Sequence, residues 1–324
     1  AELPGILLQL PGIDGEVREI ELLRVDILAP DFTAVASSGA SADRPGLHYR
    51  GQLRDQPGTI AAISIFDDGM MGMFVDASGQ TFQLGALEND PETYVVYNSK
   101  DLRTQMPLEC GADEAALIPG DEDEPVVGDR GVGCKTVKIY FECDYKLYTD
   151  KGSNLNNAVN YVTGLFNQVA TLYANDNVGV AISQVYVWTT PDPYQALTST
   201  SAVLTAFRNT RGSNHNGNLA HFLSTRSLGG GIAYLDVICF KEYAHGVSAI
   251  AGSYQNVPVY SWSVEVVTHE LGHNLGAWHT HSCSWPGGAI DNCYTPEGSC
   301  APGQPPVNGG TIMSYCHLTG NGIN

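Results

Sequence analysis

The sequence is poor in basic residues and has no long apolar stretch. Its 324 residues include 16 Lys and Arg against 35 Asp and Glu, a formal net charge of −19. Such a charge disfavours contact with phosphate backbones and excludes nucleic acid as an expected partner. No apolar run approaches the roughly 20 residues that a membrane-spanning helix needs, so we expect no membrane segment. A signal peptide is also lacking, and the start at Ala1 is typical of a chain already processed or expressed without one.

The acidic charge is concentrated in the first part of the chain. Residues 1–130 hold 24 acidic and 8 basic residues, which gives −16, whereas residues 131–324 hold 11 and 8, which gives −3. With a length that suggests about two domains, this asymmetry predicts a boundary near residue 130. Residues 120–131 are acidic and contain Gly and Pro, which is typical of an exposed linker. Arg130 is a candidate cleavage point for a trypsin-like activating protease; the alternative is an ordinary solvated loop.

One short segment, residues 269–279, carries the strongest chemical signal. His269 and His273 are four residues apart, so on a helix they lie on one face, where two imidazoles can bind zinc. Glu270 stands between them and can accept a proton from a water on the metal. Gly276 tolerates positive φ, so it can end the helix and turn the chain back. That turn brings His279 to the same metal as a third ligand.

This spacing is the signature of the metzincin zinc proteases, which the segment resembles. A structural zinc site is the alternative, but such sites usually fill four positions with Cys or His, and three ligands leave one open. Downstream, residues 310–315 are similar to the metzincin Met-turn, which places Met313 beneath the zinc. The resemblance implies one catalytic Zn²⁺. Calcium is conceivable, but no acidic loop specifies it.

Residues 1–130 predict an antiparallel β region. The expected strands are residues 17–29, 48–53, 59–66, 70–75 and 80–84. The region resembles the pro-domain of adamalysins (reprolysins, peptidase family M12), on the segments 48–51 and 97–102. Residues 106–111, with Cys110 before a glycine, are similar to the cysteine switch, whose thiolate binds the zinc of the zymogen. The alternative for Cys110 is a disulfide with Cys134.

Residues 131–324 predict an α/β catalytic domain. Strands are expected at 135–141, 180–188, 221–224 and 231–235, and helices at 154–174 and 199–208. The order resembles the metzincin upper subdomain, here to about residue 276, followed by a lower subdomain at 277–324. The family's edge strand, which pairs with the substrate backbone, corresponds to Gly230, Gly231, Ile232 and Ala233. An ordinary glycine-rich loop is the alternative. The sequence ends before the C-terminal helix that the family normally has, so we expect either a longer natural protein or a shortened chain.

Two residues depart from the adamalysin pattern. Thr280 follows the third histidine where that branch has Asp. Met313 and Tyr315 are similar to the Met-x-Tyr of astacins and serralysins, in which the tyrosine ligates zinc or stabilises the transition state. Tyr315 could act in that way or form a wall of the pocket. The branch within the metzincins therefore stays open.

Eight cysteines favour an oxidising, secreted setting. Cys134 and Cys143 would be roughly 30 Å apart along an extended strand, which is too far for a bridge. We expect Cys293–Cys300, which close a short loop, and Cys283–Cys316, both expected beneath the zinc. Cys143–Cys239 is a third candidate.

Together these features predict a two-domain α+β protein, with a β-rich pro-domain before a metzincin catalytic domain. The resemblance implies a secreted, latent zinc endopeptidase that hydrolyses peptide bonds in proteins. Its own pro-domain would inhibit it until an activating protease cuts residues 120–131. The rival hypothesis is a non-catalytic adhesion or binding module on the same scaffold.

Overall fold

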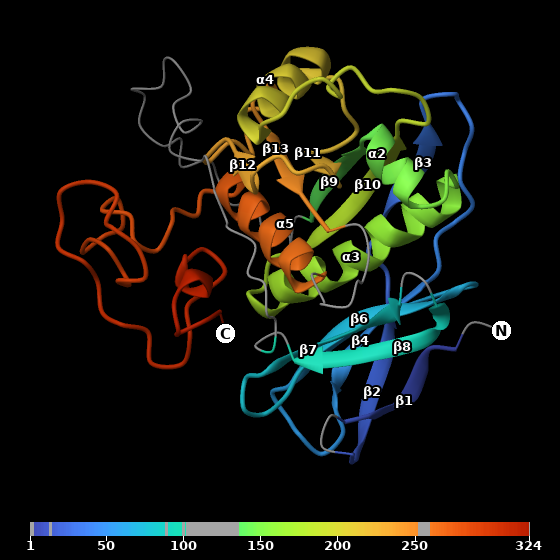
Figure 1. Ribbon diagram of the computed structural model, residues 1–324, viewed down its shortest axis with the longest axis horizontal. Helices are drawn as coiled ribbons and strands as arrows, with labels where there is room; N and C mark the ends of the chain where they lie inside the picture. The colour runs from blue at the N-terminus through green and yellow to red at the C-terminus, as the bar shows by residue number, and fades with distance from the viewer. Residues whose placement is uncertain are drawn as a thin grey trace.

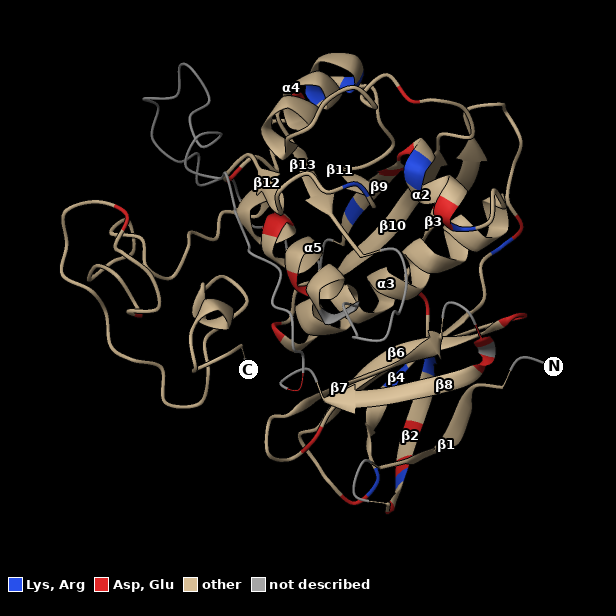
Figure 2. Ribbon diagram, in the orientation of Figure 1, with Lys and Arg blue, Asp and Glu red and all other residues tan. Residues whose placement is uncertain are grey.

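The computed structural model describes residues 3–12, 15–87, 90–98, 101, 136–251 and 260–323. Two β-sheets dominate it, with helix α3 between them (Figure 1). One sheet has seven strands and the other has six. No helix in these described ranges is long and apolar enough to cross a bilayer. Basic residues are few and lie scattered over the described chain (Figure 2).

The seven-stranded sheet is antiparallel throughout, in the order β1-β2-β4-β5-β6-β7-β8. Its strands are β1 (Gly5–Pro11), β2 (Val17–Val25), β4 (Leu47–Leu53), β5 (Ile60–Phe66), β6 (Gly69–Val75), β7 (Thr81–Leu87) and β8 (Asp90–Asn98). One face buries an apolar cluster that includes Ile20, Tyr49 and Phe74. The predicted antiparallel strands of the N-terminal part are thus present.

The single strand expected at residues 17–29 is wrong. Strand β2 ends at Val25, and the Asp26 side chain accepts a hydrogen bond from the backbone N–H of Leu28 at 3.1 Å, which supports a change of direction. A separate strand, β3 (Leu28–Ala36), then pairs in parallel with β10 in the other sheet. Pro30 is tolerated in β3 because β3 is an edge strand.

The six-stranded sheet runs β12-β13-β11-β9-β10-β3, and only β12 is antiparallel to its neighbour. Its later strands are β9 (Val137–Cys143), β10 (Val180–Val187), β11 (Leu219–Ser224), β12 (Gly231–Ala233) and β13 (His245–Ala249). Sequence analysis missed β13, whose five residues include histidine, glycine and serine. This mixed sheet with helices agrees with the α/β expectation.

Helices cover both faces of the six-stranded sheet. Helix α3 (Leu155–Asn175) starts at Asn154, whose side chain accepts the N–H of Asn157, and packs its apolar side between the two sheets. Helix α4 (Thr200–Arg211), capped by Ser199, covers the opposite face. A short helix, α2 (Tyr145–Asp150), follows β9. Helix α5 (Tyr260–Asn274) lies beside α3, with Val267 and Leu271 fully buried.

After α5 the chain has little regular structure, and two disulfides connect its loops. They join Cys283 to Cys300 and Cys293 to Cys316. The expected pairs Cys293–Cys300 and Cys283–Cys316 are therefore wrong. The chain folds back so that Glu297 runs beside Ser282, with the N–H of Cys283 bonded to the Glu297 carbonyl, which brings Cys300 to Cys283.

The third expected bridge is also wrong. Cys143 lies buried at the end of β9, whereas Cys239 is exposed, and both thiols are free. Cys110 and Cys134 lie outside the described residues, so their pairing stays a prediction.

Candidate metal centre

Three histidine side chains converge at the end of α5. The Nε2 atoms of His269, His273 and His279 lie 3.0, 3.2 and 3.2 Å from one another, and all three residues are buried. Two imidazoles bound to a tetrahedral zinc at its usual bond length are about 3.3 Å apart. The observed spacing is close to that value, and these residues form a group that can hold a metal ion.

Hydrogen bonds on the outer side fix the orientation of each ring. Nδ1 of His269 bonds the Ile312 carbonyl at 2.7 Å, and Nδ1 of His273 bonds the Ala277 carbonyl at 2.8 Å. Because a carbonyl only accepts, each Nδ1 carries the proton. The Nε2 lone pairs then point inward, where they repel one another unless a cation lies between them. The donor set therefore fits a zinc ion.

Burial keeps His269 and His273 uncharged. It lowers the pKa of His269 well below its usual range and that of His273 to about 3. Neutral imidazole is the form that ligates a metal. At pH 7 these two histidines can therefore bind a cation without first losing protons.

The turn after α5 positions the third histidine. Gly276 has φ +98°, its N–H bonds the His273 carbonyl, and the N–H of Ala277 bonds the Gly272 carbonyl. These two bonds form a Schellman motif, which ends the helix and reverses the chain. Gly276 thus lies in the turn that follows α5, and this turn allows His279 to return toward α5.

Glu270 lies beside the edge strand β12. Its carboxylate is fully buried, and a Cβ added to Gly231 would lie 2.2 Å from Glu270 Oε1. Only glycine at this position leaves room for the glutamate. Sequence analysis assigned the glycines to the approach of a substrate; here Gly231 accommodates Glu270, and its contact with substrate stays a prediction.

Strand β12 (Gly231–Ala233) is one edge of the six-stranded sheet, and it includes three of the four residues proposed for the substrate strand. Its inner side pairs Gly231 with Ser248, Ile232 with Val247 and Ala233 with Gly246, while the Gly230 carbonyl accepts the N–H of Ala249. A strand at an edge can pair with an extended peptide.

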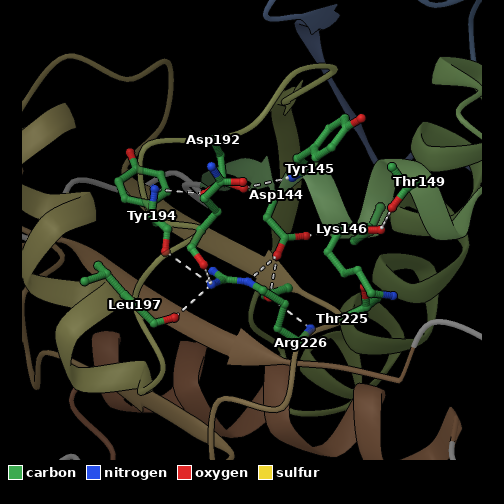
Figure 3. Close-up of polar contacts among 12 residues, drawn as sticks. Asp144, Tyr145, Lys146, Thr149, Asp192, Tyr194, Leu197, Thr225 and Arg226 are labelled. Carbon is green, nitrogen blue, oxygen red and sulfur yellow. Dashed lines mark hydrogen bonds and ion pairs between the residues drawn. The ribbon is translucent and has the colours of Figure 1, made fainter.

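A partly buried arginine anchors the loop that leads into β12 (Figure 3). Nε of Arg226 donates to Asp144 at 2.9 Å, and Nη1 donates to the carbonyls of Tyr194, Gln195 and Leu197. Two residues later, the Leu228 carbonyl accepts the N–H of Thr200. The segment before β12 is thus attached to the start of α2, to the loop before α4 and to α4 itself.

The predicted Met-turn residues lie close to the zinc-motif segment. A Cβ on Gly272 would be 2.7 Å from the Met313 sulfur, so Met313 packs against α5 at Gly272. The Tyr315 ring is buried, with its centroid 5.0 Å from that of His279. The Thr280 hydroxyl donates to Asp291, which places an aspartate near the position of departure from adamalysins.

Sequence analysis missed Glu297, which supports the third histidine. Its Oε1 lies 2.6 Å from His279 Nδ1 and 3.0 Å from His281 Nε2. Burial raises the pKa of Glu297, but the hydrogen bonds from His279 and His281 outweigh burial and lower it. The carboxylate therefore stays ionised and fixes the His279 ring. No periodic pattern marks Glu297, because only the folding-back of the loop brings it to the histidine.

We expect Glu297→Gln to weaken zinc binding roughly 10- to 100-fold, the usual effect of losing an outer carboxylate. The glutamine amide keeps an oxygen that can accept a hydrogen bond, but it lacks the negative charge that holds His279 and His281. Competition with a chromophoric chelator measures the affinity. An affinity equal to that of the wild-type protein would show that Glu297 does not support the metal.

The proposed switch and the linker cannot be placed against this centre. Cys110, Arg130 and residues 120–131 all lie outside the described residues. The zymogen ligand, the activation site and the boundary at residue 130 therefore stay predictions.

The chain is similar to known proteins over most of its length. A family model described as metallo-peptidase family M12 matches residues 134–322. A zinc metalloproteinase-disintegrin-like protein of Cerberus rynchops is 24% identical over 272 residues, which are 78% of this chain and 42% of that protein. The chain thus spans less than half of this curated relative. A chain from a solved structure of a chaperone–substrate complex is also similar. The match covers 82% of this chain and 44% of that chain, at 12% sequence identity and a TM-score of 0.36.

Proposed function

The chain belongs to metallo-peptidase family M12, and on that basis we propose that it is a zinc-dependent endopeptidase whose metal is held by His269, His273 and His279. The observation that carries the proposal is the convergence of three Nε2 atoms within 3.2 Å, each ring oriented from its outer side. Three protein ligands leave the fourth position of a tetrahedral zinc for the reaction.

Glu270 is the general base in this proposal. A bound zinc ion would lower the pKa of the attacking water and polarise the scissile carbonyl. Glu270 would accept a proton of that water as the water oxygen bonds to the carbonyl carbon, and would then pass the proton to the leaving amine as the C–N bond breaks. Its burial and its place beside Gly231 hold the carboxylate next to the edge strand.

Residues 230–233 would align the substrate. An extended peptide can add to the open side of β12 through main-chain hydrogen bonds, which demands no particular side chains. Tyr315, whose ring lies 5.0 Å from that of His279, either stabilises the transition state or walls the pocket beyond the scissile bond. The substrates would be proteins and peptides; which ones is not specified by this geometry.

Latency is the second part of the proposal. Residues 1–130 would act as an inhibitory pro-domain of a secreted enzyme, and residues 131–324 as the catalytic domain. Cys110 would occupy the fourth zinc position until a protease cuts within residues 120–131. Two disulfides favour the oxidising setting that secretion provides.

The experiment uses the full chain with its linker cut by a site-specific protease. We expect one zinc per chain by atomic emission, and casein hydrolysis that a chelator abolishes and added zinc restores. Bound zinc at that ratio, with no hydrolysis after the cut, would instead favour the binding-module hypothesis.

A further inference from the structure

We propose that residues 3–98 form a lasting subunit of the folded protein, which stays bound to residues 136–323 after the chain between them is cut. The mature form is then a two-chain complex. The surface involved is the β10 edge together with one side of α3, and its partner is the N-terminal region of the same chain. This inference extends the proposed latency, but it concerns assembly and does not depend on catalysis.

The first contact is the strand β3, which completes the six-stranded sheet. Its residues Thr33 to Ala36 pair in register with Gln184 to Val187 of β10. At the two ends of the ladder, the N–H of Ile182 donates to the Ile27 carbonyl at 2.9 Å, and the N–H of Ser37 donates to the Val187 carbonyl at 2.8 Å. Removal of β3 would leave the β10 backbone groups unpaired along a newly exposed edge.

The second contact joins α3 to the seven-stranded sheet. Gly164 makes room for Met71, because a Cβ there would lie 2.2 Å from the Met71 sulfur. Asn167, fully buried, donates from Nδ2 to the carbonyls of Tyr49 and Ile63 at 3.3 and 3.2 Å. A glycine that avoids a clash and an amide that is fully buried both suit a side of α3 that packs against a sheet, not a side that faces water.

The two regions also share one apolar core. Side chains from the N-terminal region belong to the same buried cluster as those of α3, β9, β10 and α5; the N-terminal members are Ile27, Ala34, Ala62, Met71, Met73 and Tyr97. Separation would expose this cluster on both sides. Interfaces that resemble a divided core are typical of obligate assemblies rather than of transient ones.

This contact lies away from the proposed substrate strand. Strands β3 and β12 are the opposite edges of the six-stranded sheet (Figure 1). A retained β3 therefore does not cover β12. Activation in this proposal does not require the departure of the N-terminal region.

A protease recognition sequence inserted between Gly120 and Asp121 tests the proposal. After cutting, the two fragments should elute together in size-exclusion chromatography at about 1 μM and have the summed mass by native mass spectrometry. Elution as two separate folded fragments at that concentration would overturn the proposal. The result is independent of zinc and of hydrolysis, so it is distinct from a failure of the proposed activity.

Matched variants identify the surface. Met71→Glu places a charge against Gly164 and should release the fragments after cutting, whereas Leu23→Glu, at a side chain 70% exposed, should leave them together. If Met71→Glu does not fold, the proposal is tested by amide hydrogen exchange of the wild-type protein after cutting. The N–H of Ser37, which bonds β10, should stay as protected as in the uncut chain. Loss of its protection on cutting would contradict the proposal.

Discussion

Replacement of Glu270 by glutamine is expected to abolish most peptide hydrolysis while zinc stays bound. The amide has almost the same volume as the carboxylate, so it fits beside Gly231, but it cannot accept a proton from the attacking water. General acid–base catalysis contributes roughly 10²- to 10⁴-fold, so kcat should fall by that factor. The measurement is kcat on a quenched fluorescent peptide, with the zinc content determined on the same sample.

The control for this change is Glu242→Gln, at a side chain that is 64% exposed and pairs with Arg208 rather than with the metal centre. It makes the same chemical substitution and should leave kcat and zinc content unchanged. A Glu270→Gln protein that retained more than about one tenth of wild-type hydrolysis would exclude Glu270 as the base. Loss of zinc along with activity would mean that the variant had disturbed the ligands instead.

Removal of the Cys293–Cys316 bridge is expected to have the largest effect on stability. After Leu275 the described chain has almost no regular secondary structure, so cross-links replace hydrogen-bonded elements there. The bridge joins residues that are 23 apart in sequence. In the chain-entropy model, this cross-link lowers the conformational entropy of the unfolded chain and so stabilises the folded protein by about 3 kcal/mol. In the protein with Cys293→Ser and Cys316→Ser, the free energy of unfolding should fall by about that amount, as measured by urea denaturation.

The same double variant should also bind zinc more weakly. Cys316 follows Tyr315, and its bridge fixes the loop that passes beneath His279. Helix α5 carries His269 and His273, whereas His279 lies in the loops after it, and the Ile312 carbonyl that orients His269 belongs to the bridged segment. Cys239→Ser, at an exposed free thiol, is the matched control and should alter neither property. An unchanged free energy of unfolding in the double variant would show that the loops keep their structure without the bridge.

Features with a short sequence separation were predicted well. His269, His273, Gly276 and His279 lie within eleven residues, so the local helix and its closing turn bring the three histidines together. Helices α3 and α4 were likewise predicted close to their observed bounds, and the structure shows them capped by Asn154 and Ser199. These interactions lie within a few residues of one another, so the backbone conformations of the local segment determine them.

Features that join distant segments were missed or predicted wrongly. Both disulfides pair differently from the expectation, because the order of cysteines along a loop does not say where the loop folds back. Glu297 reaches His279 over 18 residues of irregular chain. The separate strand β3 was not predicted, since apolar residues continue from β2 through residues 27–30 without a glycine to mark the break.

The sequence by itself therefore determined which residues are the candidate ligands and base, and the helix that carries them. Tertiary structure decided which strands form the edges of the six-stranded sheet among the described residues, which carboxylate contacts His279, and which elements of the N-terminal region pack against α3 and β10. The physical reason is the same in each case. A side chain's type and local spacing define the chemistry it can perform, whereas contacts between distant segments depend on the packing of whole sheets and helices.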